Sequence, residues 1–85
     1  MRTSDPQVAA LEEILAADSV TISANLAERA LGIRRGRLAD YAREKPDAIR
    51  HIPHIPSGNR VKVIRVPFLR WLGCTEEEIK EKRLR

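Results

Sequence analysis

Apolar residues recur at helical spacing in the first part of the chain and alternate with polar residues later on. The first run predicts a helix from about residue 6 to residue 17, with Ser4 as its N-terminal cap. Its apolar positions are Val8, Leu11, Ile14 and Leu15. The β-branched segment 20–22 that follows predicts a short strand.

Two more helices are expected directly after this strand. Ser23 is a good cap for a helix from Ala24 to about Leu31, and Gly32 suits a left-handed C-terminal cap. A second helix is predicted from about residue 34 to residue 45, where Pro46 stops it. Two helices joined by a tight Gly-Ile turn are typical of a helix-turn-helix.

The next segment has the pattern of a β-hairpin. An edge strand is expected around residues 54–56, and Gly58-Asn59 favours a two-residue turn with positive φ. Residues 60–65 then alternate, with Val61 and Val63 on one face and basic residues on the other. This order predicts a hairpin wing attached to a helical core.

The chain is expected to close with two helices. The first begins at Pro67, ends at Gly73 and places Phe68, Trp71 and Leu72 in the core. The second, within residues 75–85, opens with a capping box from Thr75 to Glu78 and is too poor in apolar residues to pack firmly.

Charge changes this picture because it is unevenly distributed. The net charge of the 85-residue chain is +4, but residues 34–70 alone hold ten basic and three acidic side chains. A basic middle region of this kind favours a polyanionic partner such as nucleic acid. The alternative is a basic face that is merely solvated.

The start of the second helix of the predicted pair carries the first group of candidate contacts. Arg34, Arg35 and Arg37 are expected in its first turn, where the helix dipole disfavours cations. Arginine also reads guanine in the major groove, so DNA contact would explain this placement. The alternative is that these arginines pair with the neighbouring carboxylates Asp40, Glu44 or Asp47.

The outward face of the same helix completes this group. Ala39 is small enough to let the backbone approach DNA, and Arg43 shares its face. Asp40 would either accept a hydrogen bond from a cytosine amino group or orient a neighbouring arginine.

The hairpin and the first helix of the pair supply the second group. Asn59, Arg60 and Lys62 are expected to contact the DNA backbone or the minor groove. Ser23 and Asn25 are candidates for phosphate contacts, although Ser23 is equally well explained as a helix cap. Arg65 would either contact DNA or brace the wing against the core.

The residue pattern does not favour a metal site, an enzyme active site or a membrane segment. His51, His54 and the single cysteine, Cys74, lack the spacing of a zinc site, and we expect no metal or other cofactor. No catalytic triad, carboxylate pair or phosphate loop is evident, so the chain is not expected to be an enzyme. Without a signal peptide or a run of ~18 apolar residues, we expect a cytoplasmic protein that does not enter a membrane.

The order of elements resembles the excisionase-type, MerR-like winged helix-turn-helix family. The likeness covers about residues 20 to 73. It rests on the segment from Leu26 to Ile33, on Arg34 to Ala42 where the recognition helix lies, and on Gly58 to Arg65 with Phe68 and Trp71-Leu72. The chain looks closest to the small excisionases of conjugative transposons. It departs from the family in having Arg34 where the recognition helix usually has a Ser or Thr cap.

The resemblance implies an α+β, small winged helix-turn-helix domain spanning residues 1–85, with its core in 20–73. It also implies double-stranded DNA as partner, an integrase or recombinase that the bound and bent DNA serves, and head-to-tail self-association on DNA. A transcriptional regulator with the same surface is the first alternative. The second is a protein-binding adaptor, such as a phage packaging or assembly subunit.

Overall fold

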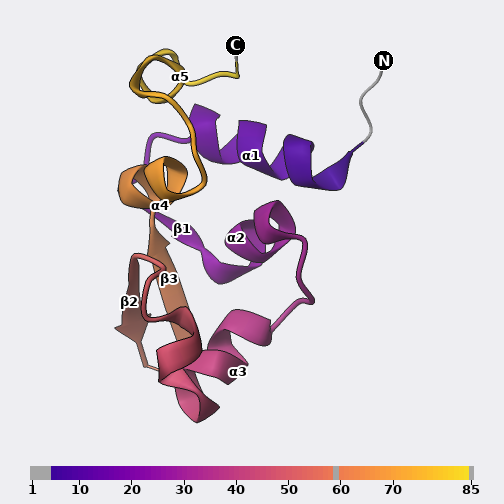
Figure 1. Cartoon of the computed structure of the whole chain (residues 1–85), viewed down its shortest axis with the longest axis vertical. Helices are drawn as coiled ribbons and strands as arrows, with labels where there is room; N and C mark the ends of the chain where they lie inside the picture. The colour runs from indigo at the N-terminus through magenta and orange to yellow at the C-terminus, as the bar shows by residue number, and fades with distance from the viewer. Residues whose placement is uncertain (1–4, 59, 85) are drawn as a thin grey trace.

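Three short strands form one antiparallel sheet, in the order β1 (Thr21–Ser23), β3 (Arg60–Ile64), β2 (His54–Ser57). The computed structural model describes residues 5–58 and 60–84, and five α-helices accompany the sheet within these ranges. They are α1 (Pro6–Ala16), α2 (Ala24–Leu31), α3 (Arg37–Glu44), α4 (Arg65–Trp71) and α5 (Glu76–Glu81). The chain is therefore a small α+β protein. Its long axis of 38 Å separates α1, α4 and α5 at one end from α3 and the tip of the β2–β3 hairpin at the other (Figure 1).

The first two helices lie where the sequence predicts them. Asp5 caps α1, because its carboxylate accepts a hydrogen bond from the Gln7 amide at 2.9 Å; the predicted cap, Ser4, lies outside the described residues. Ser23 caps α2 as expected, accepting from the Leu26 amide at 3.2 Å. Gly32 closes α2 with φ of +75°, a conformation that glycine adopts without steric cost.

The third helix begins later than predicted, at Arg37 rather than Arg34. Gly36 precedes it with φ of +90°, and this left-handed residue separates the helix from a turn that contains Arg34 and Arg35. The apolar periodicity did not reveal this because the pattern starts only at Leu38. Helix α3 ends at Glu44, shortly before the predicted stop Pro46, and the chain then forms a short 3₁₀ helix, η1 (Pro46–Ile49).

The predicted hairpin is confirmed. β2 pairs with β3 so that Ser57 lies opposite Arg60 and Ile55 opposite Lys62. Val61 and Val63 are buried while Arg60 and Lys62 are exposed, which is the expected alternation. Gly58 has the predicted positive φ, and Asn59 lies outside the described residues.

The fourth helix starts two residues before Pro67, so β3 ends at Ile64 rather than at residue 65. A proline in the first turn costs nothing there, because its missing amide would have no partner in the helix. The core placement of Trp71 is wrong: the residue is 42% exposed and stacks on the outside of Phe68, with ring centroids 5.9 Å apart.

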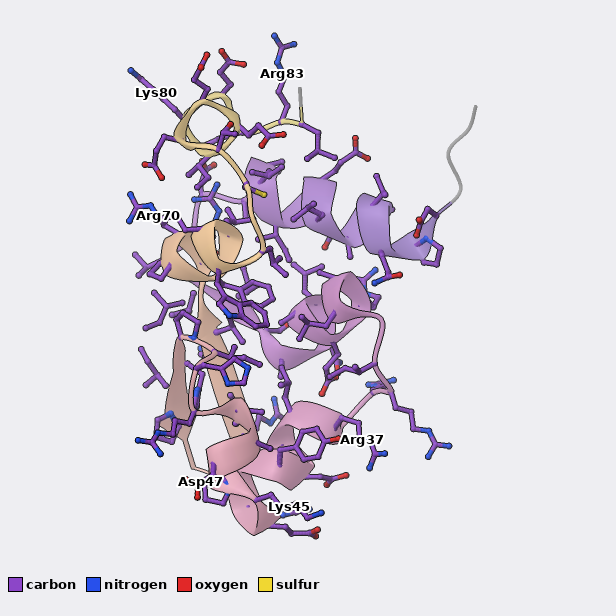
Figure 2. All side chains as sticks on the ribbon, in the orientation of Figure 1. Arg37, Lys45, Asp47, Arg70, Lys80 and Arg83 are labelled. Atoms are coloured by element: carbon purple, nitrogen blue, oxygen red, sulfur yellow. The ribbon has the colours of Figure 1, made fainter. Side chains whose placement is uncertain are left out.

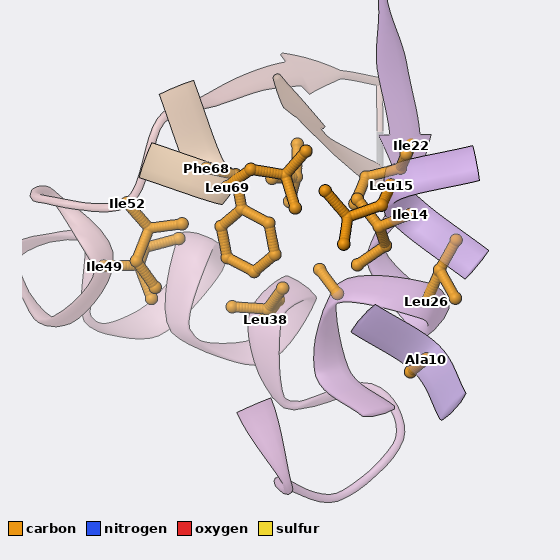
Figure 3. Close-up of a cluster of buried hydrophobic side chains, with 12 residues drawn as sticks. Ala10, Ile14, Leu15, Ile22, Leu26, Leu38, Ile49, Ile52, Phe68 and Leu69 are labelled. Carbon is orange, nitrogen blue, oxygen red and sulfur yellow. The ribbon is translucent and has the colours of Figure 1, made fainter. Parts of the chain in front are cut away.

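The core lies between α1, α2, α3, α4 and the sheet (Figure 3). Its largest fully buried apolar side chains come from α1, α3, α4 and β3; they are Phe68, Ile14, Leu15, Leu38, Leu69 and Val63. Helix α5 has the predicted capping box, in which Thr75 and Glu78 exchange hydrogen bonds of 2.8 and 3.1 Å. It buries no residue fully, and Ile79 and Leu84 pack partly against the core.

Arg65 is the one position where the core holds a basic side chain among the described residues. It is 7% exposed, and its guanidinium donates to the carbonyl oxygens of Ile14 and Leu15 at 2.7 and 2.5 Å. These carbonyls lie in the last turn of α1, where the helix dipole favours a cation. The bracing alternative is therefore confirmed for Arg65, which ties the start of α4 to the end of α1.

Candidate nucleic-acid interface

A groove of about 380 Å³ opens between the start of α2, the start of α3 and the β2–β3 hairpin. Six of the residues predicted to contact DNA line it; they are Ser23, Asn25, Arg35, Ala39, Arg60 and Lys62. These residues come from segments that are far apart in the chain, so the tertiary fold brings them together. A second depression of about 450 Å³ continues past Asn25 and Arg35 along α2.

The basic side chains of this groove lack acidic partners. Arg35, Arg60 and Lys62 form no ion pair with any residue in 5–58 and 60–84. All three are exposed. The one carboxylate that lines the groove, that of Glu28, accepts hydrogen bonds from the backbone amides of Gly36 and Leu38, so these three cations are not neutralised in ion pairs.

The structure separates the three arginines that the sequence grouped together. Arg34 and Arg35 lie in the turn before α3, so the prediction that they belong to its first helical turn is wrong. Arg37 does start the helix, but its guanidinium lies over the Tyr41 ring, 5.6 Å from the centroid, and does not line the groove. Figure 2 shows Arg37 on the α3 end of the molecule.

Asp40 and Arg43 form an ion pair of 2.7 Å on the exposed side of α3. This pair is the contact expected if Asp40 orients a neighbouring arginine, and the hydrogen bond of Asp40 with a cytosine amino group stays a prediction. Both side chains lie outside the groove. Ala39 points into it, where a small side chain leaves room for a ligand to approach the helix.

The start of α2 supplies the polar rim of the groove. The Ser23 oxygen is engaged as the helix cap, accepting from Leu26. Asn25, one residue into the helix, is exposed and lines both depressions. The predicted contact Asn59 lies outside the described residues, beside a hairpin whose described part forms one wall.

Glu28 is the important residue of this region that the sequence reasoning missed. Its side chain is only 1% exposed, and its two oxygens accept hydrogen bonds from the amides of Gly36 and Leu38, at 3.0 and 2.9 Å. A signal existed in the sequence. Residues 34–37, where the sequence predicts the start of this helix, hold three arginines and a glycine but no capping side chain, so the free amides needed an acceptor from elsewhere.

Other residues that carry reactive groups remain outside this region. Cys74 is partly buried, and burial together with the nearby Glu78 carboxylate raises the pKa of its thiol, which opposes a role as nucleophile. Within the described ranges no cluster of His, Cys, Asp or Glu is arranged to hold a metal ion. No described helix has the length and apolar character needed to cross a bilayer.

Comparisons with protein-family models, with curated proteins and with solved structures find no match to this chain.

Proposed function

We propose that this chain is a winged helix-turn-helix protein that binds double-stranded DNA through the groove between α2, α3 and the hairpin. The observation that carries the proposal is the convergence of Arg35, Arg60 and Lys62, from a turn and a strand, without acidic partners. These three cations outnumber the single carboxylate of the groove, Glu28, so the groove is net positive and attracts a polyanion.

The shape of the site suggests how each part would act. We expect a sugar–phosphate backbone to lie along the groove, where β3 contributes Arg60 and Lys62, α2 contributes Asn25 and the turn before α3 contributes Arg35. The exposed face of α3 then lies in the major groove, and the hairpin lies on the adjacent backbone or minor groove. Phosphate contacts fix the register, while Arg35 or Arg37 reads base edges.

The biological role that we propose is that of an excisionase, a directionality factor which binds and bends DNA so that an integrase excises a mobile element. This part rests on the resemblance of residues 20–73 to that family. A footprint on the DNA flanking the gene tests it. Protected, regularly spaced sites near a recombination site support excision, whereas protection confined to a promoter favours a transcriptional regulator.

Salt dependence of binding tests the DNA proposal itself. Fluorescence anisotropy with a random-sequence duplex should show affinity that falls steeply between about 50 and 200 mM salt, with a log–log slope of about −3 if the three groove cations each neutralise a phosphate. Absence of salt-dependent binding contradicts the proposal and leaves the protein-binding adaptor as the better explanation.

A matched pair of lysine variants locates the contact. Lys62→Ala and Lys80→Ala each remove one exposed lysine that has no ion-pair partner in the described structure, one beside the groove and one on α5. Figure 2 shows Lys80 at the end of the molecule away from α3. We expect Lys62→Ala to reduce the salt slope by about 1 and Lys80→Ala to leave it unchanged. Equal effects would mean that only net charge matters.

A further inference from the structure

Glu28 is a buried carboxylate whose bonding partners are backbone amides. Among the described residues it has no basic side chain within ion-pair distance, and both of its oxygens face the start of α3. Burying an ionised carboxylate is costly unless hydrogen bonds and a positive potential compensate. Here two amides and the positive end of the α3 dipole provide that compensation.

This contact replaces the cap that α3 lacks. Gly36 occupies the capping position and has no side chain, and its φ of +90° would strain a serine or asparagine there. The carboxylate reaches across from α2 and accepts from Leu38, the second residue of α3, as a local cap would. Its other oxygen holds the amide of Gly36 itself.

The same contact fixes the segment that carries the groove arginine. Residues 32–36 join α2 to α3, and the Glu28 carboxylate accepts a hydrogen bond from Gly36 at the far end of this segment. We propose that Glu28 is a positioning residue, whose carboxylate holds the Arg34–Arg35 turn and the start of α3 in the geometry that binds DNA. The inference rests on the proposed function for its DNA part alone.

Loss of the Glu28 charge and loss of its hydrogen bonds should change DNA binding in opposite directions, and Glu28→Gln distinguishes the two. The substitution removes a negative charge that lines the groove, so electrostatics alone would strengthen DNA binding. Glutamine has one acceptor oxygen, so it keeps at most one of the two amide bonds and loosens the turn. Glu12→Gln, an exposed position on α1, is the matched control for the charge change.

Hydrogen exchange in the free protein tests the contact without DNA. In the wild type we expect the Gly36 and Leu38 amides, which donate to Glu28, to exchange more slowly than the Arg35 amide. Amides near a helix start that have no acceptor are not protected in this way. Glu28→Gln should lower the protection of the Gly36 amide, the Leu38 amide or both about tenfold. The protection of the Leu26 amide should not change. Wild-type amides of Gly36 and Leu38 that exchange as fast as Arg35 would overturn the proposal, even if the variant fails to fold.

Binding by the folded variants tests the consequence for DNA. The probes are a random-sequence duplex and a duplex that the wild-type protein selects from a random library. We expect Glu28→Gln to bind the selected duplex about tenfold more weakly, a change of about 1.4 kcal/mol, and the random duplex at least as tightly as the wild type does. Glu12→Gln should preserve the preference. Tighter binding of the selected duplex by Glu28→Gln would contradict the positioning role of Glu28.

The two proposals fail in different ways. If the wild-type protein binds no duplex, the DNA function is wrong, whereas slow exchange of Gly36 and Leu38 would still show that Glu28 holds the turn. If the wild type binds DNA and Glu28→Gln keeps the full sequence preference, the DNA function stands and the positioning role of Glu28 is wrong.

Discussion

The two ends of the molecule carry charged side chains in opposite ways. Around α1, α4 and α5, several basic residues are paired with carboxylates, such as Arg70 with Glu76 at 2.7 Å and Lys82 with Asp18, although Lys80 has no such partner within the described ranges. Around the groove at the α3 and hairpin end, Arg35, Arg60 and Lys62 have no such partner in the described structure. Ion pairs on the surface contribute little to the free energy of unfolding, whereas unpaired charges remain available to bind a partner.

Arg65 shows a third use of a basic residue, inside the core. Its bonds to Ile14 and Leu15 use carbonyl oxygens instead of a carboxylate, and they join segments about half the chain apart. The net charge of the chain therefore says little about what each basic residue does. What matters is whether each cation is buried, paired or free.

The largest expected effect comes from removing the buried cation. Arg65→Met keeps much of the apolar volume but leaves two carbonyl oxygens near the core without their donor, so we expect a loss of about 3 kcal/mol in the free energy of unfolding. Chemical denaturation followed by circular dichroism measures it. The control is Arg70→Met on the exposed side of the same helix, where we expect a much smaller loss because a solvent-exposed ion pair contributes little. Equal losses would show that Arg65 does not brace the fold.

The next effect sharpens the contrast between free and paired arginines. Arg35→Ala should weaken binding to a selected duplex by about 1–3 kcal/mol and relax sequence preference. Arg83→Ala removes the same charge from a residue paired with Glu81 at the other end, and should change binding little. Competition binding with selected and random duplexes measures both. A uniform loss for Arg35→Ala on every sequence would make Arg35 a phosphate contact and not a base reader.

A smaller effect is expected at the end of the molecule with the paired charges. Thr75→Ala removes the side chain that accepts from Glu78 in the α5 capping box, at a cost of about 1 kcal/mol. Thermal unfolding should show this loss, while the affinity for DNA stays the same. Weaker DNA binding by the folded variant would contradict the division of roles between the two ends.

The smallest effect concerns the pH dependence of one surface pair. A hydrogen bond from Arg70 lowers the pKa of the Glu76 carboxyl below its usual 4.5. The pair therefore stabilises the fold fully above the unfolded-state pKa, and its contribution disappears as the pH falls through the lower folded-state value. NMR titration should find a low Glu76 pKa that rises in Arg70→Gln. An unchanged pKa in that variant would show that Arg70 is not the cause.

Local signals in the sequence were enough for most elements of the fold. Ser23 and Gly32 mark both ends of α2, and the alternation around Val61 and Val63 marks β3. These predictions succeeded because caps, turns and alternation depend on residues only a few positions apart. The start of α3 was placed too early because Gly36 looks like a small helix residue until its backbone conformation is known.

The candidate site was predictable as a set of residues but not as an arrangement. Arg35, Arg60 and Lys62 were singled out by charge and position, and the fold gathers them around one groove. Arg37 and Arg43 were singled out for the same reasons, yet one lies over Tyr41 and the other pairs with Asp40. Which cations remain unpaired depends on side chains that pack from neighbouring turns, and charge counts do not show this.

The order of residues was enough to predict the helices, the hairpin and the excess of basic residues between positions 34 and 70. The contacts of Glu28 with the start of α3 and of Arg65 with the end of α1 became visible only in the folded chain. The physical reason is that buried hydrogen-bonding groups must find partners wherever the fold brings them. For Glu28 those partners are eight and ten residues away, and for Arg65 they are 51 and 50 away.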